Sequence, residues 1–219
     1  IRDSLLSILI FGIIITSKSI DPLTDLTHIS GNISKLEPRT VSIEGVKIYT
    51  QPSDSTCGIA AISTTVSFLK GEEVFPEELL VKYNLREKRG MNYDQFLNYL
   101  SLELPGYDIE YRSGLDDFKL IEAIHEQLVR NIPVPVFLGS PNPYNEPFYD
   151  FHASVITGID FERNKVNIAN VYGYEEEISF LEFLNRMSYR EIDKYPFMQK
   201  LIIKTGLIDI NSVFLIRKN

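Results

Sequence analysis

The single cysteine of this chain stands in a sequence context that suits a nucleophile. Gly58 and a long apolar run follow Cys57, and Gln51 lies six residues before it. A thiol attacks as the thiolate, and the backbone N–H groups at the start of a helix favour that anion. We therefore expect Cys57 in the first turn of a helix with a lowered pKa. We also expect the Gln51 amide to fold back beside the sulfur and donate to an oxyanion.

Three histidines are candidates for the base that activates this thiol. His28 lies in a mixed polar lead-in, outside the expected domain. His125 lies inside an expected helix between two glutamates, where a solvated or rim position is expected. His152 begins an apolar strand after a polar loop, residues 140–150, and the start of a strand is a rigid mount for a base. The sequence favours His152.

A nucleophile and its base need a third side chain that accepts the other ring N–H and sets the tautomer. Asn170 ends an expected strand that should pair with the strand after His152. We expect Asn170 to accept the Nδ1–H of His152. Asp150, at the end of the polar loop, and Asp160 are rivals, and Asn167 is a weaker one.

Hydrophobic spacing predicts the elements that must position these residues. Ser55 or Thr56 can cap the helix that Cys57 opens, and Gly71 can close it. Asn92 can cap a later helix. Helices are expected before an antiparallel sheet, and this order argues for an α+β fold. The expected helices cover residues 59–69, 77–83, 93–102 and 115–130, and the expected strands cover 134–138, 153–159, 165–169 and 213–216, with a short strand or hairpin in 41–49.

The first twenty residues differ in kind from the rest. Residues 5–15 are nearly all apolar, which is short of the ~20 residues that a membrane span needs. The run has the length of a signal-peptide core, and Ser17 and Ser19 follow it. We expect residues 1–20 to be an export signal or short anchor, 21–40 a linker and 41–219 one domain. If so, we expect a secreted or membrane-associated protein of the bacterial cell envelope. The alternative for residues 1–20 is a buried helix or strand of the fold.

Composition excludes several classes of function. The net charge is −8, and the densest basic cluster, Arg86, Lys88 and Arg89, is interrupted by Glu87, so no nucleic-acid partner is expected. One cysteine and three scattered histidines give no zinc-ligand spacing, so no cofactor or metal is expected. With 44% hydrophobic residues in 219, the chain can bury the core of one medium domain.

Three stretches carry a family resemblance. Residues 47–69, KIYTQPSDSTCGIAAISTTVSFL, resemble the catalytic-cysteine segment of the bacterial double-glycine-leader peptidases, a papain-like cysteine peptidase family. Residues 152–160, HASVITGID, resemble its histidine strand, and residues 165–173, KVNIANVYG, resemble the strand that ends in its Asp-Pro motif. The resemblance runs from about Val46 to the carboxy terminus. It implies a papain-like proteinase fold, in which an amino-terminal helical part packs on an antiparallel sheet.

The chain departs from that family at three places. The usual Asp-Pro reads Asn170-Val171, and Asn is the papain-like choice, so the orienting role is expected to survive. Residues 190–210 look like an insertion. Transporter-borne members are fused to an ABC exporter, but no Gly-x4-Gly-Lys-Ser/Thr motif occurs here. A stand-alone peptidase is therefore expected, and the leader-peptide substrate does not simply carry over.

The expected function is a cysteine peptidase or amidase that acts on a peptide or protein substrate. Cys57 would be the nucleophile, His152 the base, Asn170 the orienting residue, and Gln51 a donor to the oxyanion. An acyltransferase or transglutaminase-like enzyme on the same pair is the first alternative. A non-catalytic module that holds a peptide in the same groove is the second.

Overall fold

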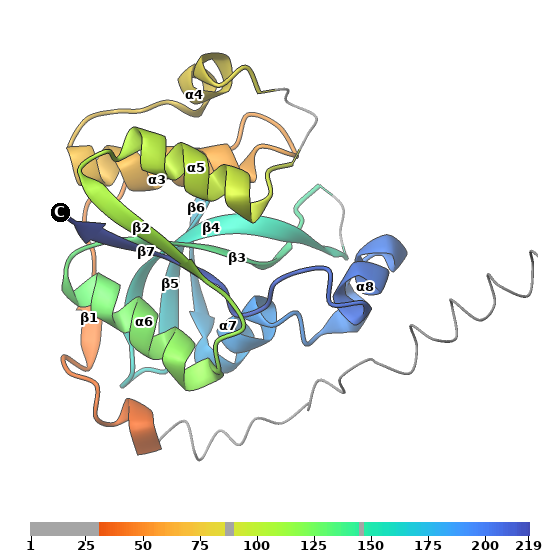
Figure 1. Ribbon diagram of the computed structural model, residues 1–219. Coiled ribbons are helices and arrows are strands. Elements are labelled where there is room, and N and C mark those ends of the chain that lie inside the picture. Colours follow the sequence, from red (N-terminus) through yellow and green to blue (C-terminus); the bar gives the residue numbers. More distant parts are fainter. Residues whose placement is uncertain (1–30, 86–89, 145–146) are drawn as a thin grey trace, which may run out of the picture.

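The computed structural model describes residues 31–85, 90–144 and 147–219 (Figure 1). In this part of the chain, seven strands form one antiparallel sheet in the order β2-β7-β3-β4-β5-β6, with β1 paired to β4. The strands are β1 (Thr40–Ser42), β2 (Tyr107–Arg112), β3 (Val134–Pro141), β4 (Tyr149–Asp160), β5 (Lys165–Asn170), β6 (Tyr174–Ser179) and β7 (Val213–Lys218). The helices are α3 (Cys57–Lys70), α4 (Pro76–Lys82), α5 (Tyr93–Glu103), α6 (Asp117–Val129), α7 (Phe180–Met187), η1 (Ile192–Lys194) and α8 (Phe197–Lys204).

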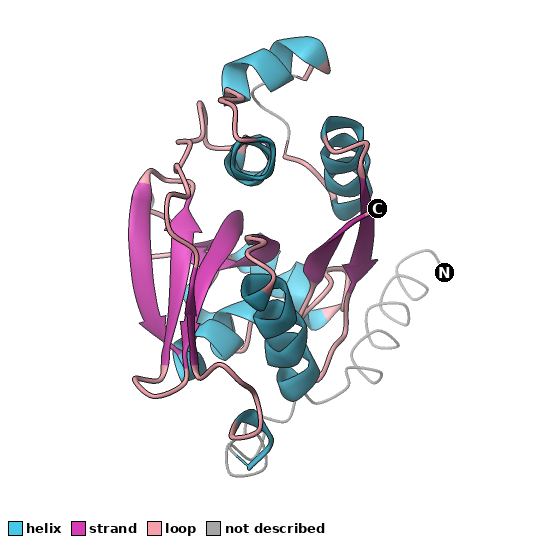
Figure 2. Ribbon diagram, turned by 90° about the vertical axis from the view of Figure 1, so that its left-hand side faces the viewer, coloured by secondary structure: helices cyan, strands magenta, loops and turns pink. Residues whose placement is uncertain are grey.

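Helices cover the sheet on both faces. Figure 1 shows α3, α4 and α5 together on one side, and α6 and α7 on the other. Successive residues of a strand point to opposite faces, so Phe137 packs in the core beneath α3 and α5, while Val136 and Leu138 pack in the core beside α6 and α7. This explains why β3 reads as a continuous apolar run. Figure 2 shows how strongly the sheet twists between its two edges.

Helix α3 begins at the cysteine and ends where the sequence predicts. Gly71 adopts the left-handed conformation, and its N–H donates to Ser67 O at 3.0 Å. Thr56 stands at the N-cap, but its side chain makes no capping bond and donates instead to Ser53 O at 2.8 Å. The first N–H groups of α3 therefore remain available to the cysteine sulfur.

The expectation that helices precede the sheet is wrong in detail. β2 lies between α5 and α6, and α7, η1 and α8 lie between β6 and β7. β6 reads YEEEIS, which lacks the apolar alternation of a strand, because only one of its side chains is buried. The predicted helices and the 165–169 and 213–216 strands are present, and the Asn92 cap forms a capping box with Gln95.

The segment before β1 packs against the core that lies beside α6 and α7. Ile33 and Leu36 contact this core, and the Arg39 guanidinium donates to Ile33 O at 2.7 Å. His125 on α6 is only 4% exposed, and its Nε2 bonds to Pro38 O at 2.9 Å. The expectation of a solvated or rim position for His125 is therefore wrong, because residues before β1 cover it. His28 lies outside the described residues.

Among the described helices, none has both the length and the apolarity that crossing a membrane would require.

Candidate active site

Cys57 is the first residue of α3 and is half-buried where this helix packs across β4. Burial raises the pKa of its thiol, although the backbone N–H groups of Ala153, Gly58 and Cys57 itself favour the thiolate and oppose this rise. The nearby charge of Asp150 adds to the rise. The expectation of a lowered pKa is therefore wrong, because desolvation of the anion outweighs the effect of the helix start.

His152 lies in β4 and is 2% exposed. Burial lowers the pKa of its imidazole to about 4, while the bond to Asn170 and the charge of Asp150 act in the opposite direction. The ring stacks on Tyr172, with centroids 4.1 Å apart and planes 14° apart. An imidazole held in this way is neutral near pH 7 and has one nitrogen free to take a proton.

Asn170, the last residue of β5, contacts the His152 ring. Its Oδ1 lies 3.1 Å from Nε2 of His152 and also accepts the N–H of Tyr172 at 3.1 Å. The expected partner was Nδ1, and the structure corrects this to Nε2, which leaves Nδ1 as the nitrogen available to a thiol. The structure thus brings His152 and Asn170 together, as the sequence predicts.

The orientation of the Asn170 amide is defined by its nitrogen. Nδ2 lies 3.3 Å from Ser140 Oγ, 3.3 Å from Tyr174 OH and 3.1 Å from Glu176 Oε2, and its two N–H groups are shared among these three oxygens. Because the Glu176 carboxylate only accepts and the Tyr172 N–H only donates, Nδ2 faces Glu176 and Oδ1 faces the imidazole. The tautomer of His152 with hydrogen on Nε2 follows.

A buried ion-pair network extends behind this amide. Oε1 of Glu176 accepts from Arg186 at 2.7 Å, and Arg186 also donates to Glu182 at 2.6 Å. Arg186 is 3% exposed and belongs to α7. The network connects α7 to the back of the site through Glu176.

Gln51 is 8% exposed and lies in the loop before α3. Its backbone N–H donates to Val171 O at 2.8 Å, so this loop is fastened to the turn that follows Asn170. Gly173 in that turn has φ +103°, and a Cβ there would lie 2.7 Å from Thr50 Oγ1. The Oε1 of Gln51 has no hydrogen-bond partner among the described residues.

Asp150 lies in β4, and its carboxylate accepts from Gln199 Nε2 at 2.8 Å and from the Asn142 amide. The loop is shorter than the expected range 140–150, because β3 and β4 pair as far as Pro141 and Tyr149. Asp150 therefore belongs to the sheet and not to a solvated loop. It is two residues from His152 and acts on the site through its charge.

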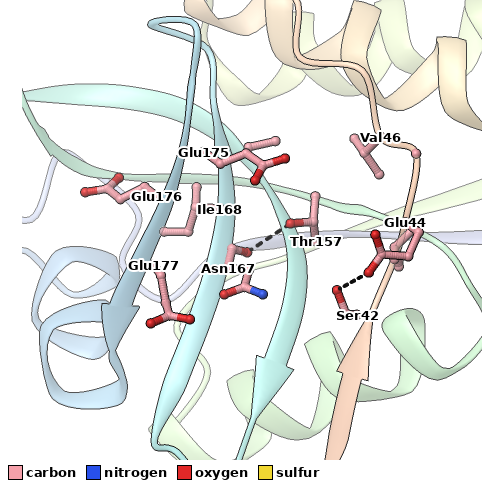
Figure 3. A pocket seen from close by; sticks show the side chains of 12 residues that line it. Ser42, Glu44, Val46, Thr157, Asn167, Ile168, Glu175, Glu176 and Glu177 are labelled. Atoms are coloured by element: carbon pink, nitrogen blue, oxygen red, sulfur yellow. Dashed lines mark hydrogen bonds between the residues drawn. The ribbon is translucent and has the colours of Figure 1, made fainter.

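The other two rivals of Asn170 have different roles. Asp160 accepts the N–H groups of Glu162 and Arg163 in the turn between β4 and β5. Asn167 lies in β5 beside a separate cavity of about 560 Å³, which acidic residues of β6 also line (Figure 3).

Sequence reasoning missed Tyr172 and Glu176, which contact His152 and Asn170 respectively. Tyr172 lies within the 165–173 stretch, and an aromatic residue two positions after the orienting residue was an available signal. Glu176 is one of three consecutive glutamates in β6, and nothing in that run distinguishes it.

A cavity of about 490 Å³ opens beside Cys57. Residues 190–210, the expected insertion, form η1 and α8 and supply one of its walls. The residues that line it are Asp54, Ser55, Cys57, Gly90, Met91, Asn92, Tyr93, Phe137, Asp150, Phe151, Tyr189, Gln199, Ile202, Leu207 and Ile208. Within residues 31–85, 90–144 and 147–219, no group of three or more His, Cys, Asp or Glu residues is arranged to hold a metal ion.

Comparison with known proteins gives a family and a fold. The model of the Peptidase_C39 like family matches residues 43–197. The peptidase domain of Streptococcus ComA, a bifunctional ABC transporter of a quorum-sensing pathway, matches at 14% identity and TM-score 0.52, over 80% of this chain and 100% of that chain. Xylellain, a cysteine protease from Xylella fastidiosa, matches at 14% identity and TM-score 0.50, over 86% of this chain and 89% of that chain. The comparison with curated proteins gave no match. These likenesses confirm the papain-like α+β fold.

Proposed function

The chain belongs to the Peptidase_C39 like family and is a cysteine-type peptidase, and from this premise we propose that it hydrolyses peptide or amide bonds with Cys57 as nucleophile and His152 as base. The observation that carries the proposal is the contact of His152 Nε2 with Asn170 Oδ1 at 3.1 Å. It leaves Nδ1 unprotonated on a buried, neutral ring. The N–H of Ala153, the residue next to His152, reaches the Cys57 sulfur.

In the first step, Nδ1 of His152 takes the thiol proton as the sulfur attacks the substrate carbonyl carbon. The carbonyl oxygen becomes an oxyanion, which the Cys57 backbone N–H and the Gln51 side-chain amide stabilise. The intermediate collapses, and His152 gives its proton to the departing amine. The acyl group stays on Cys57 as a thioester.

In the second step, His152 takes a proton from water, and the hydroxyl attacks the thioester carbonyl. The carbon–sulfur bond breaks, the acid product leaves, and the thiol regains its proton. Asn170 does not touch the reacting atoms; it is a positioning residue that keeps hydrogen on Nε2 throughout. Tyr172 covers one face of the imidazole and shields this bond from water.

Gln51 supplies the sharpest test of this mechanism. We expect Gln51→Ala to lower kcat by roughly 10²–10³-fold with little change in KM, because the oxyanion donor acts in the transition state. Cys57→Ser should abolish turnover of a fluorescently labelled protein substrate and keep the fold. A rise in KM alone for Gln51→Ala would make this residue a substrate contact, and turnover retained in Cys57→Ser would overturn the proposal.

We also propose that residues 1–20 act as an export signal or short anchor of a secreted or membrane-associated enzyme. The apolar run at residues 5–15 supports this, and these residues lie outside the described part. The full chain and a chain lacking residues 1–20 should separate on cell fractionation, with only the full chain in the envelope or the medium. Equal distribution would contradict the proposal.

A further inference from the structure

The 490 Å³ cavity lies on one side of the Cys57 sulfur. It is lined by Cys57, but its lining does not include His152, Gln51 or Tyr172. In the proposed mechanism, the leaving amine departs beside His152, because this residue must protonate it. The acyl part of the substrate stays with Cys57, so the cavity is placed to hold side chains of the acyl part.

Two carboxylates give the cavity negative charge. Asp150 and Asp54 line it, and no lysine or arginine is among its lining within the described residues. The two groups that donate to the Asp150 carboxylate, from Asn142 and Gln199, are neutral amides. A carboxylate accepts about four hydrogen bonds, so Asp150 keeps acceptor capacity beyond these two amides.

Gln199 adds a second, independent acceptor. Its Nε2 donates to Asp150, which turns the amide oxygen away from that carboxylate. This Oε1 is buried and has no hydrogen-bond partner among the described residues. A buried carbonyl oxygen without a donor is costly, and a ligand that donates several hydrogen bonds would satisfy it.

Much of the remaining wall is apolar. Met91, Phe137 and Phe151 line the cavity, and Ile202 and Ile208 of the 190–210 segment add to them. Such walls suit an aliphatic stem that ends in a charged head, as arginine and lysine have. The planar guanidinium of arginine presents five donors, enough for both Asp150 and Gln199.

We propose that this cavity selects a basic residue, arginine above lysine, at one of the two substrate positions on the acyl side of the scissile bond. Asp150 and Gln199 bind the cationic head, and the apolar walls hold its stem. Asp54 also lines the cavity, is exposed and adds to the attraction for a cation. The inference rests on the proposed function and gives it a substrate class.

The test is a set of fluorogenic peptides that place arginine, citrulline, lysine, norleucine or glycine at each of the two positions. Citrulline matches arginine in shape and lacks the charge. We expect kcat/KM for arginine to exceed that for citrulline by roughly 10–10²-fold, because a charge-assisted hydrogen bond discriminates on this scale. In Asp150→Asn, this ratio should fall to within about threefold.

Asp108→Asn is the matched control. Asp108 is exposed on edge strand β2 and does not line the cavity, so this variant makes the same change in net charge elsewhere. Its arginine-to-citrulline ratio should equal that of the unaltered protein. The ratio is the readout because it is insensitive to any loss of overall rate in Asp150→Asn.

Each outcome decides between the two ideas. Turnover of the peptides with equal rates for arginine and citrulline, or a preference for glycine, would overturn the inference and leave the proposed function standing. A ratio that persists in Asp150→Asn would also overturn it. No turnover of any peptide, together with no labelling of Cys57 by a peptidyl acyloxymethyl ketone, would overturn both.

Discussion

At the scale of single residues, the thiol and the imidazole of this site are both more stable uncharged. Burial raises the pKa of Cys57 and lowers that of His152 to about 4, so the resting pair is a neutral thiol and a neutral base. In the proposed mechanism, such a pair reacts by general-base transfer and not from a stored ion pair. In this mechanism, the proton leaves the thiol as the sulfur attacks the substrate carbonyl.

This state predicts two different pH profiles. Alkylation of Cys57 by iodoacetamide follows thiolate, so its midpoint should lie at or above the free-thiol value of about 8.5. Peptide turnover needs neutral His152 and should fall only as pH drops toward about 4. Because Cys57 is the single cysteine, every label reports on it. An alkylation midpoint well below 8 would show an ion pair and contradict this description.

The choice of Asn at position 170 has a local reason. Its Nδ2 lies 3.1 Å from a carboxylate oxygen of Glu176, so an Asp at this position would place two carboxylates side by side. We expect Asn170→Asp to lower kcat/KM about 10-fold or more. Adding Glu176→Gln should restore much of the loss, with a coupling free energy of about 1–3 kcal/mol.

The same double-mutant cycle separates catalysis from folding. Glu176→Gln alone weakens the pair with Arg186, and urea unfolding of each variant measures that cost independently of turnover. If Asn170→Asp is as active as the unaltered protein, Glu176 does not dictate the amide.

At the scale of elements, the segment between α7 and β7 is held by aromatic packing. Tyr189, Tyr195, Tyr149 and Ile203 form a small core of their own. Tyr195 is 1% exposed and lies against Gly139 in β3, where a Cβ would be 1.7 Å from the phenol oxygen and 2.8 Å from Cζ. Only glycine at position 139 permits this approach. The contact between Gly139 and Tyr195 holds in place the cavity wall that α8 provides.

Gly139→Ala should therefore displace Tyr195 and lower the free energy of unfolding by about 1–3 kcal/mol. KM for a peptide that fills the cavity should rise with it. Urea denaturation and steady-state kinetics measure the two effects. Gly106→Ala is the control, since nothing lies within 4 Å of a Cβ there. In a Tyr195→Ala background, the cost of Gly139→Ala should largely vanish, and a cost that persists would place the strain elsewhere.

At the scale of the whole molecule, the site joins two layers of the fold. Cys57 belongs to a helix on one face of the sheet, whereas His152 and Asn170 belong to paired strands within it. No single element carries all the proposed catalytic residues, so the candidate site exists only when α3 has docked on β4. Conditions that unfold the protein should therefore abolish activity together with structure.

Burial of a neutral histidine predicts acid sensitivity of the fold. An unfolded histidine takes up its proton near pH 6.5, but His152 does so only near pH 4. Between these two pH values the unfolded state binds more protons than the folded state. The contribution of His152 to the free energy of unfolding is therefore fully present above about pH 6.5, and up to about 3 kcal/mol of it is lost as the pH falls toward 4. Urea midpoints at pH 7 and 4.5 measure the loss. His152→Gln should show a smaller loss, and an equal loss would assign the acid sensitivity to other groups.

The sequence by itself determined what depends on neighbouring residues. The start of α3 at Cys57, its end at Gly71 and the Asn92 cap follow from local backbone chemistry, and the strands around His152 and Asn170 follow from apolar patterning. Tertiary structure decided what depends on distant residues: the pairing of β2 with β7, the burial of His125, the docking of α8 beside the thiol, and the place of Glu176 behind Asn170. The physical reason is desolvation and packing, because a residue's neighbours in space set its exposure, its partners and its pKa.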